Sequence, residues 1–167
     1  QAAQAAFSAL TNSDKLKQHS YSQDIPRELK AEADKILEQE ILEKLLPLGL
    51  PVLTEEQGEI GVDATSGLKF VVDPLDGTVN FVRGLGGSSI CIALCENNQP
   101  IFGVLCTIPD GDIIWGGKGM GAYQNELALN VSNISNLAES VVCTGFPARF
   151  PIEDTDASKA YIKRMSS

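Results

Sequence analysis

Asp73-Pro74-Leu75-Asp76-Gly77-Thr78, followed by Val79-Asn80-Phe81, is the most informative stretch of this 167-residue chain. The apolar run 70–72 predicts a buried strand that ends where the acids begin. Proline fixes its own φ and keeps the preceding residue extended, so an ordered turn is expected. Two carboxylates on a stiff turn are hard oxygen ligands of the kind Mg²⁺ prefers. Gly77 lets backbone approach a ligand closely, and Thr78 can begin a helix whose free N–H groups face an anion. The stretch therefore indicates a metal-and-phosphate site, although an Asp-Gly turn after a strand is also common in α/β proteins.

A second acidic pair follows another short apolar run. Val52-Leu53 leads through Thr54 into Glu55 and Glu56. Adjacent acids are usually part of a solvated loop, but here two strand ends carry carboxylates. Like charges that are brought together need a cation between them. The two acidic segments therefore either lie apart or share a metal.

These segments together resemble the inositol monophosphatase family of Mg²⁺-dependent, lithium-sensitive phosphatases. Ala33-Asp34 on the preceding predicted helix, the run 118–123 and Asn125 extend the resemblance, which covers roughly residues 14 to 146. Asn80-Phe81 favours the inositol-phosphatase branch, because nucleotide bisphosphatases usually carry Lys-Glu-Phe after the Asp-Gly-Thr.

The resemblance implies a role for each matching residue. The implied metal ligands are Glu55, Asp73, the Leu75 carbonyl and Asp76, with Asp73 shared between two Mg²⁺ ions. Asp76, Gly77 and Thr78 would hold the substrate phosphate, the last two through their amides. Asp34, Glu55 and Thr78 would be catalytic, with the Thr78–Asp34 pair orienting or deprotonating the attacking water. Two-metal sites of this kind lower the pKa of water and steady the attacking and leaving oxygens.

Three departures from the family pattern are visible. The family's downstream Trp-Asp-x-Ala-Ala-Gly motif, with its ligand for the second Mg²⁺, is absent, since the only tryptophan, Trp115, precedes Gly116. The family is considerably longer, so residues 1–167 are expected to be the N-terminal portion, with the C-terminal portion absent from this sequence. Gln23 stands where the family often has the lysine of Lys-x-x-Pro, and Ala31 replaces a frequent threonine.

Three functions remain open on these residues. The first is hydrolysis of a small phosphate monoester, above all inositol monophosphate, by metal-activated water. The second is the same chemistry on another substrate, as a 3′(2′),5′-bisphosphate nucleotidase or a fructose-1,6-bisphosphatase. The third is a metal-binding fragment without catalysis, which the missing downstream aspartate suggests.

Composition limits the possible partners and location. A net charge of −9 argues against nucleic acid and anionic membrane surfaces, which need a basic partner. No apolar run approaches the ~20 residues of a membrane span. The four cysteines show no CxxC spacing and are expected to be buried free thiols in a reducing cytoplasm. The resemblance alone implies a homodimer.

The hydrophobic pattern predicts an α+β fold. Helices are expected over residues 2–10 and 27–46, the second with apolar residues at helical spacing until Pro47. Strands are expected near 52–53, 70–72, 90–94, 101–108, 113–115, 127–131 and 141–144. We expect N-terminal helices packed on an antiparallel sheet, resembling the first half of the family's αβαβα layered sandwich.

Overall fold

The computed structural model describes residues 1–11, 19–21, 29–61, 66–143, 156, 159–160 and 163. The chain divides into two compact units. The first comprises Gln1–Ser20 and Leu29–Ser132, and holds the helices and the main sheet. The second comprises Tyr21–Glu28 and Asn133–Ser167. Its described part contains the short 3₁₀ helix η3 (Leu137–Glu139), whose first turn is capped by the Asn136 side chain.

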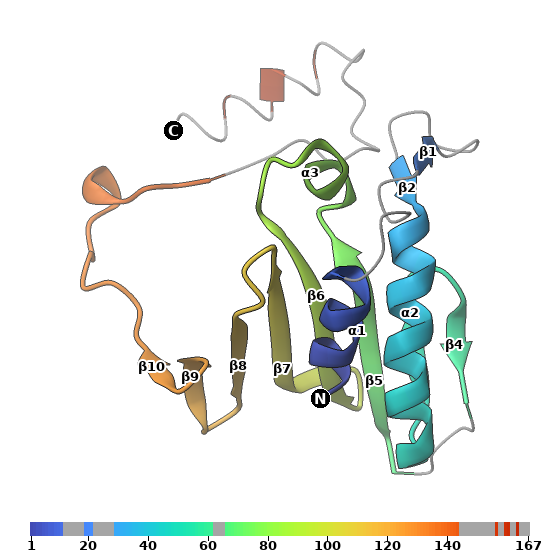
Figure 1. Ribbon diagram of the computed structural model, residues 1–167. Helices are drawn as coiled ribbons and strands as arrows, with labels where there is room; N and C mark the ends of the chain where they lie inside the picture. The colour runs from blue at the N-terminus through green and yellow to red at the C-terminus, as the bar shows by residue number, and fades with distance from the viewer. Residues whose placement is uncertain are drawn as a thin grey trace. The chain divides into compact units, whose positions relative to one another are not determined.

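An eight-stranded sheet forms the centre of the first unit (Figure 1). Its spatial order is β10-β9-β8-β7-β6-β5-β3-β4, and every neighbouring pair is antiparallel except β3 and β5, which are parallel. The strands are β3 (Val52–Thr54), β4 (Gly58–Ile60), β5 (Leu68–Asp76), β6 (Ser88–Glu96), β7 (Gln99–Ile108), β8 (Ile113–Gly117), β9 (Gly121–Gln124) and β10 (Leu127–Leu129). A tight turn at Asn97-Asn98, with φ of 50° and 64°, joins β6 to β7. Positive φ at both central residues suits the right-handed twist of a hairpin.

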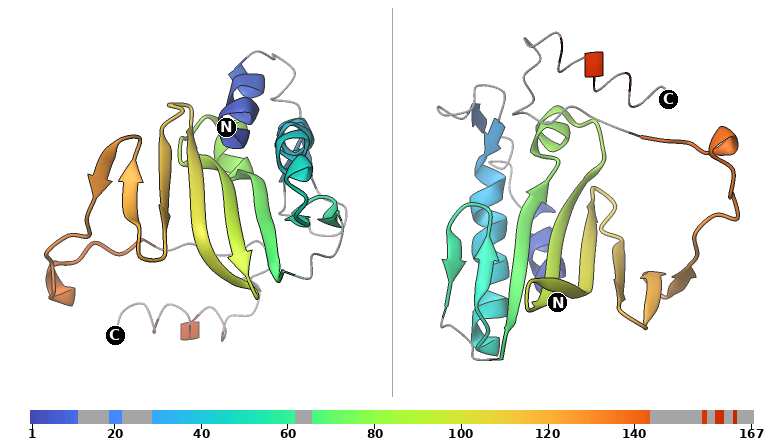
Figure 2. Two further views of the ribbon diagram at one scale, coloured as in Figure 1. Left: turned by 90° about the horizontal axis from the view of Figure 1, so that it is seen from below. Right: turned by 180° about the vertical axis from the view of Figure 1, so that it is seen from behind.

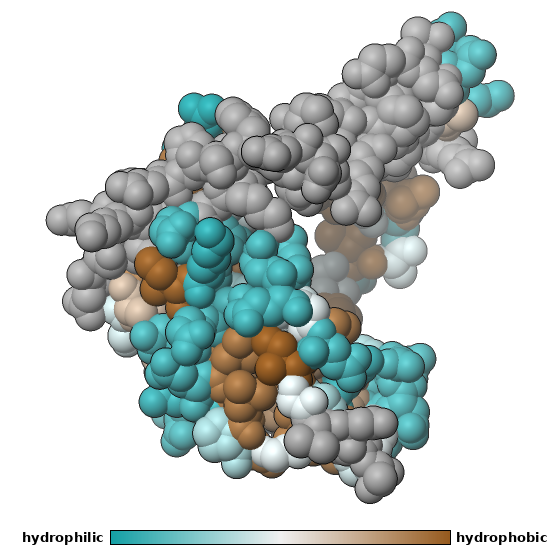
Figure 3. Space-filling view, turned by 90° about the vertical axis from the view of Figure 1, so that its right-hand side faces the viewer, coloured by the Kyte–Doolittle hydropathy of each residue, from teal (hydrophilic) through white to brown (hydrophobic). Residues whose placement is uncertain are grey.

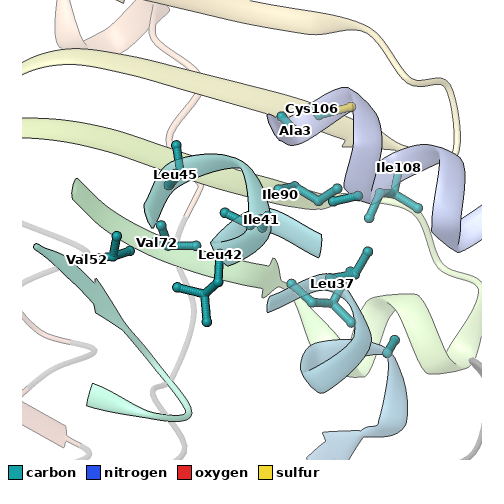
Figure 4. Packing of buried hydrophobic residues seen from close by; sticks show 13 residues of the cluster. Ala3, Leu37, Ile41, Leu42, Leu45, Val52, Val72, Ile90, Cys106 and Ile108 are labelled. Carbon is teal, nitrogen blue, oxygen red and sulfur yellow. The ribbon is translucent and has the colours of Figure 1, made fainter. Parts of the chain in front are cut away.

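Helices α1 (Ala2–Thr11) and α2 (Glu32–Leu45) lie on the same face of the sheet (Figure 2). The apolar stripe of α2, which includes Leu37, Ile41, Leu42 and Leu45, forms one buried cluster with Val52 of β3 and Val72 of β5 (Figure 4). Each fully buried aliphatic side chain of this kind contributes about 1.5–3 kcal/mol. The 3₁₀ turn η2 (Leu46–Leu48) ends α2. The prediction of an α+β fold is confirmed. The buried cluster holds α2 against β3 and β5, the strands next to the acidic residues.

The opposite side of α2 is polar. Glu32, Lys35, Gln39 and Glu43 are exposed, with a Lys35–Glu32 ion pair at 3.7 Å. Seen from the side of α2 and β4, the described surface is largely hydrophilic, with limited apolar areas (Figure 3). Within the described residues, no helix is both long enough and apolar enough to span a bilayer.

Three sequence-based boundaries are corrected. The helix predicted from residue 27 begins at Glu32, because Leu29–Ala31 form β2 and pair with β1 (His19–Tyr21). Pairing with this neighbouring strand overrides the local helical spacing. The strand predicted to end before Asp73 continues as β5 through Asp76. Residues 141–143 form no strand, and Thr144 lies outside the described residues, as does most of the tail after it.

Candidate metal and phosphate site

Parallel pairing of β3 with β5 brings the two acidic segments together. Thr54 stands opposite Val72 in this register. The next residues along the chain are Glu55, just beyond β3, and Asp73 within β5, so both lie at the same end of the parallel pair. The sequence left open whether the two acidic segments lie apart, and this pairing places Glu55 near Asp73.

A β-bulge places Asp73 and Asp76 on the same side of β5. Asp73 is opposite Cys91 and Asp76 is opposite Ser89, so three steps along β5 match two along β6. In a regular strand, residues three apart point to opposite faces. The extra residue of a bulge cancels that alternation and re-aims the side chains that follow. The Asp73 carboxylate also accepts a hydrogen bond from the Leu75 amide at 3.1 Å, which holds the turn of the chain.

Asp34 reaches this site from α2. It lies in the first turn of the helix and is only 3% exposed. Thr78 begins the short helix α3 (Thr78–Arg83), and its hydroxyl lies 3.4 Å from Asp34 Oδ1 and 3.1 Å from the Leu75 carbonyl. A hydroxyl carries a single proton, so it donates to one of these oxygens at a time. With 3% of its surface exposed, Asp34 is not an acid on a solvated helix face.

The pKa of Asp73 is raised to about 6. Burial is the largest cause, followed by the charge of Glu55, the charge of Asp76 and, more weakly, that of Asp34, while the Leu75 amide acts in the opposite direction. The carboxylates of Glu55, Asp76 and Asp34 are therefore close enough to act on that of Asp73. The field at Asp73 is negative, and a cation bound there would relieve the repulsion.

The donor set of these residues fits a hard divalent cation. Carboxylate oxygens and a backbone carbonyl are the groups that bind Mg²⁺ and Ca²⁺, and sulfur or imidazole is not required. Among the residues that the structure describes, no three Asp, Glu, Cys or His side chains already converge as a finished ligand set. Mutual repulsion accounts for carboxylates that are neighbours without converging. The site thus has oxygen ligands suited to a divalent cation, and their side chains do not converge in this structure.

Gly77 is required by the protein's own packing. Its φ is +80°, and an added Cβ would lie 2.8 Å from the Gly87 carbonyl. Buried Ser88 donates to the Gly77 carbonyl at 3.0 Å, and Asn80 donates to the Gly87 carbonyl at 3.3 Å. The sequence suggested that Gly77 serves close approach to a ligand. The structure adds a second reason, since the loop after α3 presses against this glycine.

An open hollow of about 430 Å³ begins at Asp73 and extends over the sheet face opposite α1 and α2. Its lining is almost entirely small or apolar, and includes Val71, Leu105, Ile114 and Trp115. A sugar or nucleotide needs polar partners for its hydroxyl groups or base. Among the described residues, the hollow therefore offers space beside the acids but lacks the polar side chains that would select a substrate.

The cysteines are free, as predicted, but they are not all buried. Cys95 and Cys106 are buried, Cys91 is half-buried and Cys143 is exposed. Burial, together with the nearby Asp76 and Asp73 charges, raises the pKa of the Cys91 thiol, against a hydrogen bond from Ser89. Cys91 is consequently held as a neutral thiol beside the acids.

Sequence reasoning missed two residues of the site region, Glu38 and Gln57. Glu38 is 1% exposed and accepts a 2.6 Å hydrogen bond from the side chain of Gln57. A signal for Glu38 was present, because it follows Asp34 by four residues and stands between Leu37 and Ile41 of the apolar stripe. Residues four apart share a helix face.

Comparisons with known proteins agree with this arrangement. The family model described as "Inositol monophosphatase family" matches residues 1–166. The chain belongs to the inositol monophosphatase family. It is 30% identical over 140 residues to a fructose-1,6-bisphosphatase/inositol-1-monophosphatase of Aquifex aeolicus, covering 83% of this chain and 52% of that protein. It is 39% identical over 97 residues to the Nus factor SuhB of Pasteurella multocida, covering 58% of this chain and 36% of that protein.

The fold is also that of the family's solved structures. The inositol monophosphatase from Anabaena superposes with a TM-score of 0.68 at 28% sequence identity, over 83% of this chain and 50% of that one. The chain thus spans about half the length, or less, of these relatives.

Proposed function

We propose that the complete protein is a Mg²⁺-dependent phosphatase that hydrolyses a small phosphate monoester. The observation that carries this proposal is that Glu55, Asp76 and Asp34 lie near Asp73, where burial first and then their charges raise the pKa of Asp73. Family membership supports phosphatase chemistry.

In this proposal Glu55, Asp73, the Leu75 carbonyl and Asp76 hold divalent cations. Such cations would supply Lewis-acid polarisation of the phosphoryl group and would favour deprotonation of water. Phosphoryl transfer depends mainly on positioning and charge stabilisation. Gly77 and Thr78 present backbone amides to the phosphate, beside Asp76.

The pair formed by Thr78 and Asp34 orients the attacking water. The Thr78 hydroxyl has two acceptors within reach, Leu75 O and Asp34 Oδ1. If the Leu75 carbonyl turns toward a cation, the hydroxyl proton goes to the buried Asp34. The Thr78 oxygen is then left with its lone pairs directed at water, as a proton acceptor requires.

We propose inositol monophosphate as the substrate, on the basis of Asn80-Phe81. The second candidate is fructose 1,6-bisphosphate or a 3′(2′),5′-bisphosphate nucleotide. The Aquifex relative, whose name includes both fructose-1,6-bisphosphatase and inositol-1-monophosphatase, favours keeping the first of these. A metal-binding role without catalysis is the third candidate.

Further properties proposed from the family are inhibition by Li⁺, a homodimeric state and a cytoplasmic location. The acidic composition supports a small phosphorylated substrate bound through metal, and no nucleic acid or membrane partner.

The test is phosphate release by the complete protein from a panel of inositol monophosphate, fructose 1,6-bisphosphate and 3′-phosphoadenosine phosphate. We expect activity that requires Mg²⁺ and disappears in the Asp73→Asn variant. Activity indifferent to both would refute the proposal, and preference for the nucleotide would overturn the substrate. Cation binding without any phosphate release would favour the non-catalytic candidate.

A further inference from the structure

Glu38 is an unusual residue for its position. It lies inside the buried face of α2, 1% exposed, between the core residues Leu37 and Ile41. One carboxylate oxygen accepts from Gln57 Nε2 at 2.6 Å. Among the described residues, the other oxygen, Oε1, has no hydrogen-bond partner. Burying a carboxylate with an unsatisfied oxygen is costly, so a residue of this kind calls for a reason other than packing.

The partner of Glu38 belongs to the turn that carries Glu55. Gln57 closes the connection between β3 and β4, and its backbone amide donates to Thr54 Oγ1 at 3.2 Å. The Thr54 hydroxyl in turn lies 3.3 Å from the Gly58 carbonyl. Gln57 is thus tied to β3 through its amide and to α2 through its side chain, with Glu55 in the turn between.

The turn that carries Glu55 begins directly after the last pair of the β3–β5 ladder, Thr54 with Val72. The β3–β4 pairing spans three residue pairs, and β4 is the edge of the sheet. A short edge hairpin is weakly constrained by its own ladder. The hydrogen bond to Glu38 reaches it from a helix that is anchored in the core. Because Glu38 stands one helical turn after Asp34, the same rigid element places both Asp34 and the support of Glu55.

Glu38 does not act on Asp73 as a further charge of the cluster. The groups whose charges raise the pKa of Asp73 are Glu55, Asp76 and Asp34. The contribution of Glu38 is therefore through geometry.

We infer that Glu38 is a positioning residue, which sets the place of Glu55 through its hydrogen bond to Gln57 and thereby the affinity of the site for a divalent cation. This inference rests on the metal site of the proposed function. Residues that orient a metal's ligands typically change metal affinity by 10–100-fold when they are removed.

The test is calorimetric titration of the complete protein with Mg²⁺, together with its unfolding temperature in the absence of metal. Gln57→Ala and Glu38→Ala are each expected to weaken the site near Glu55 about tenfold. The double variant should be no weaker than either single variant, because both remove one contact. Glu38→Gln should stay within about threefold of wild type, since its amide oxygen can still accept from Gln57.

A matched control is available on the same helix. Gln39 donates to Glu43 at 3.0 Å on the exposed face, the same pair of chemical groups away from the site. Gln39→Ala should leave Mg²⁺ affinity unchanged. Wild-type affinity in Gln57→Ala, whose side chain lies at the surface and whose loss leaves the core intact, would overturn the inference while leaving the proposed function standing. So would a loss in Glu38→Gln equal to that in Glu38→Ala. Failure of the wild-type protein to bind Mg²⁺ would refute the proposed function and the inference with it.

Discussion

Replacing Asp73 by Asn is expected to stabilise the metal-free protein while removing its ability to bind cations. Asn keeps the shape of the side chain, and its Oδ1 can still accept from the Leu75 amide at the observed 3.1 Å. What the replacement removes is a negative charge that burial, Glu55 and Asp76 all disfavour. The variant therefore separates the repulsion in the site from its function, a common trade-off in active sites.

The magnitude follows from the shift in pKa. Asp73 has a pKa of about 6 in the folded protein, against an ordinary value of 3.8. The folded state holds the proton more tightly, so this group contributes stability that is present below about pH 4 and is lost as the pH rises through 6. The full difference corresponds to about 3 kcal/mol at 1.36 kcal/mol per pH unit. Because the carboxyl group is only half-buried and solvent screens its neighbours, we expect about 1–2 kcal/mol.

The assay is thermal unfolding of the complete protein in a metal chelator between pH 5 and 8. At about 2–4 °C per kcal/mol, Asp73→Asn should raise the unfolding temperature by about 2–8 °C at pH 8, with a smaller gain at pH 5. Asp110→Asn, in the exposed turn after β7, serves as the control for loss of an aspartate and should change little. A variant less stable than wild type at pH 8, or a gain that does not depend on pH, would refute the reasoning.

Further predictions concern the cations and the turn. Asp76→Asn should mainly weaken one of two Mg²⁺ sites in calorimetry, whereas Asp73→Asn should remove both; equal weakening of both sites by Asp76→Asn would contradict the assignment of Asp73 as the shared ligand. Mg²⁺ affinity should fall about tenfold per pH unit below pH 6 and level off above it, because the raised pKa of Asp73 makes protons compete with the cation in that range. A flat affinity profile from pH 5 to 7 would argue against Asp73 as a ligand. Gly77→Ala should lower the free energy of unfolding in urea by about 2–4 kcal/mol, because Ala is strained at φ +80° and its Cβ meets the Gly87 carbonyl. Gly84→Ala is the control, at φ +65° with no atom within 4 Å of an added Cβ, and should lower it by about 1 kcal/mol. Equal losses in the two variants would show that the contact with Gly87 is unimportant.

Local sequence pattern was sufficient for most of the elements. Alternation and apolar runs located β6, β7 and β8, and helical spacing located α2 together with its end at Pro47. It failed at the start of α2, where Leu29–Ala31 pair with a strand ten residues earlier. Such pairing depends on tertiary structure and has no local signature.

The sequence indicated the acidic residues of the candidate site but not the residues that hold them in place. Acids at two strand ends suggested a shared cation, but their meeting depends on a parallel register that the sequence does not display. The run Asp73 to Asp76 was expected as a turn, whereas a bulge keeps it within β5. Glu38 accepts a hydrogen bond from Gln57 in the turn after β3, and Ser88 donates one to the Gly77 carbonyl. Contacts of that kind become visible only when the chain is folded.

The parallel pairing of β3 with β5 also bears on how the sheet assembles. β5, β6 and β7 are joined by successive antiparallel connections, whereas β3 must dock beside β5 from an earlier part of the chain. That docking brings Glu55 toward Asp73, so this pair of strands forms against electrostatic repulsion. Non-local pairing of this type is already slow to form. A divalent cation would therefore act on the folding protein as well as on the folded one, by lowering the barrier to closing this edge of the sheet.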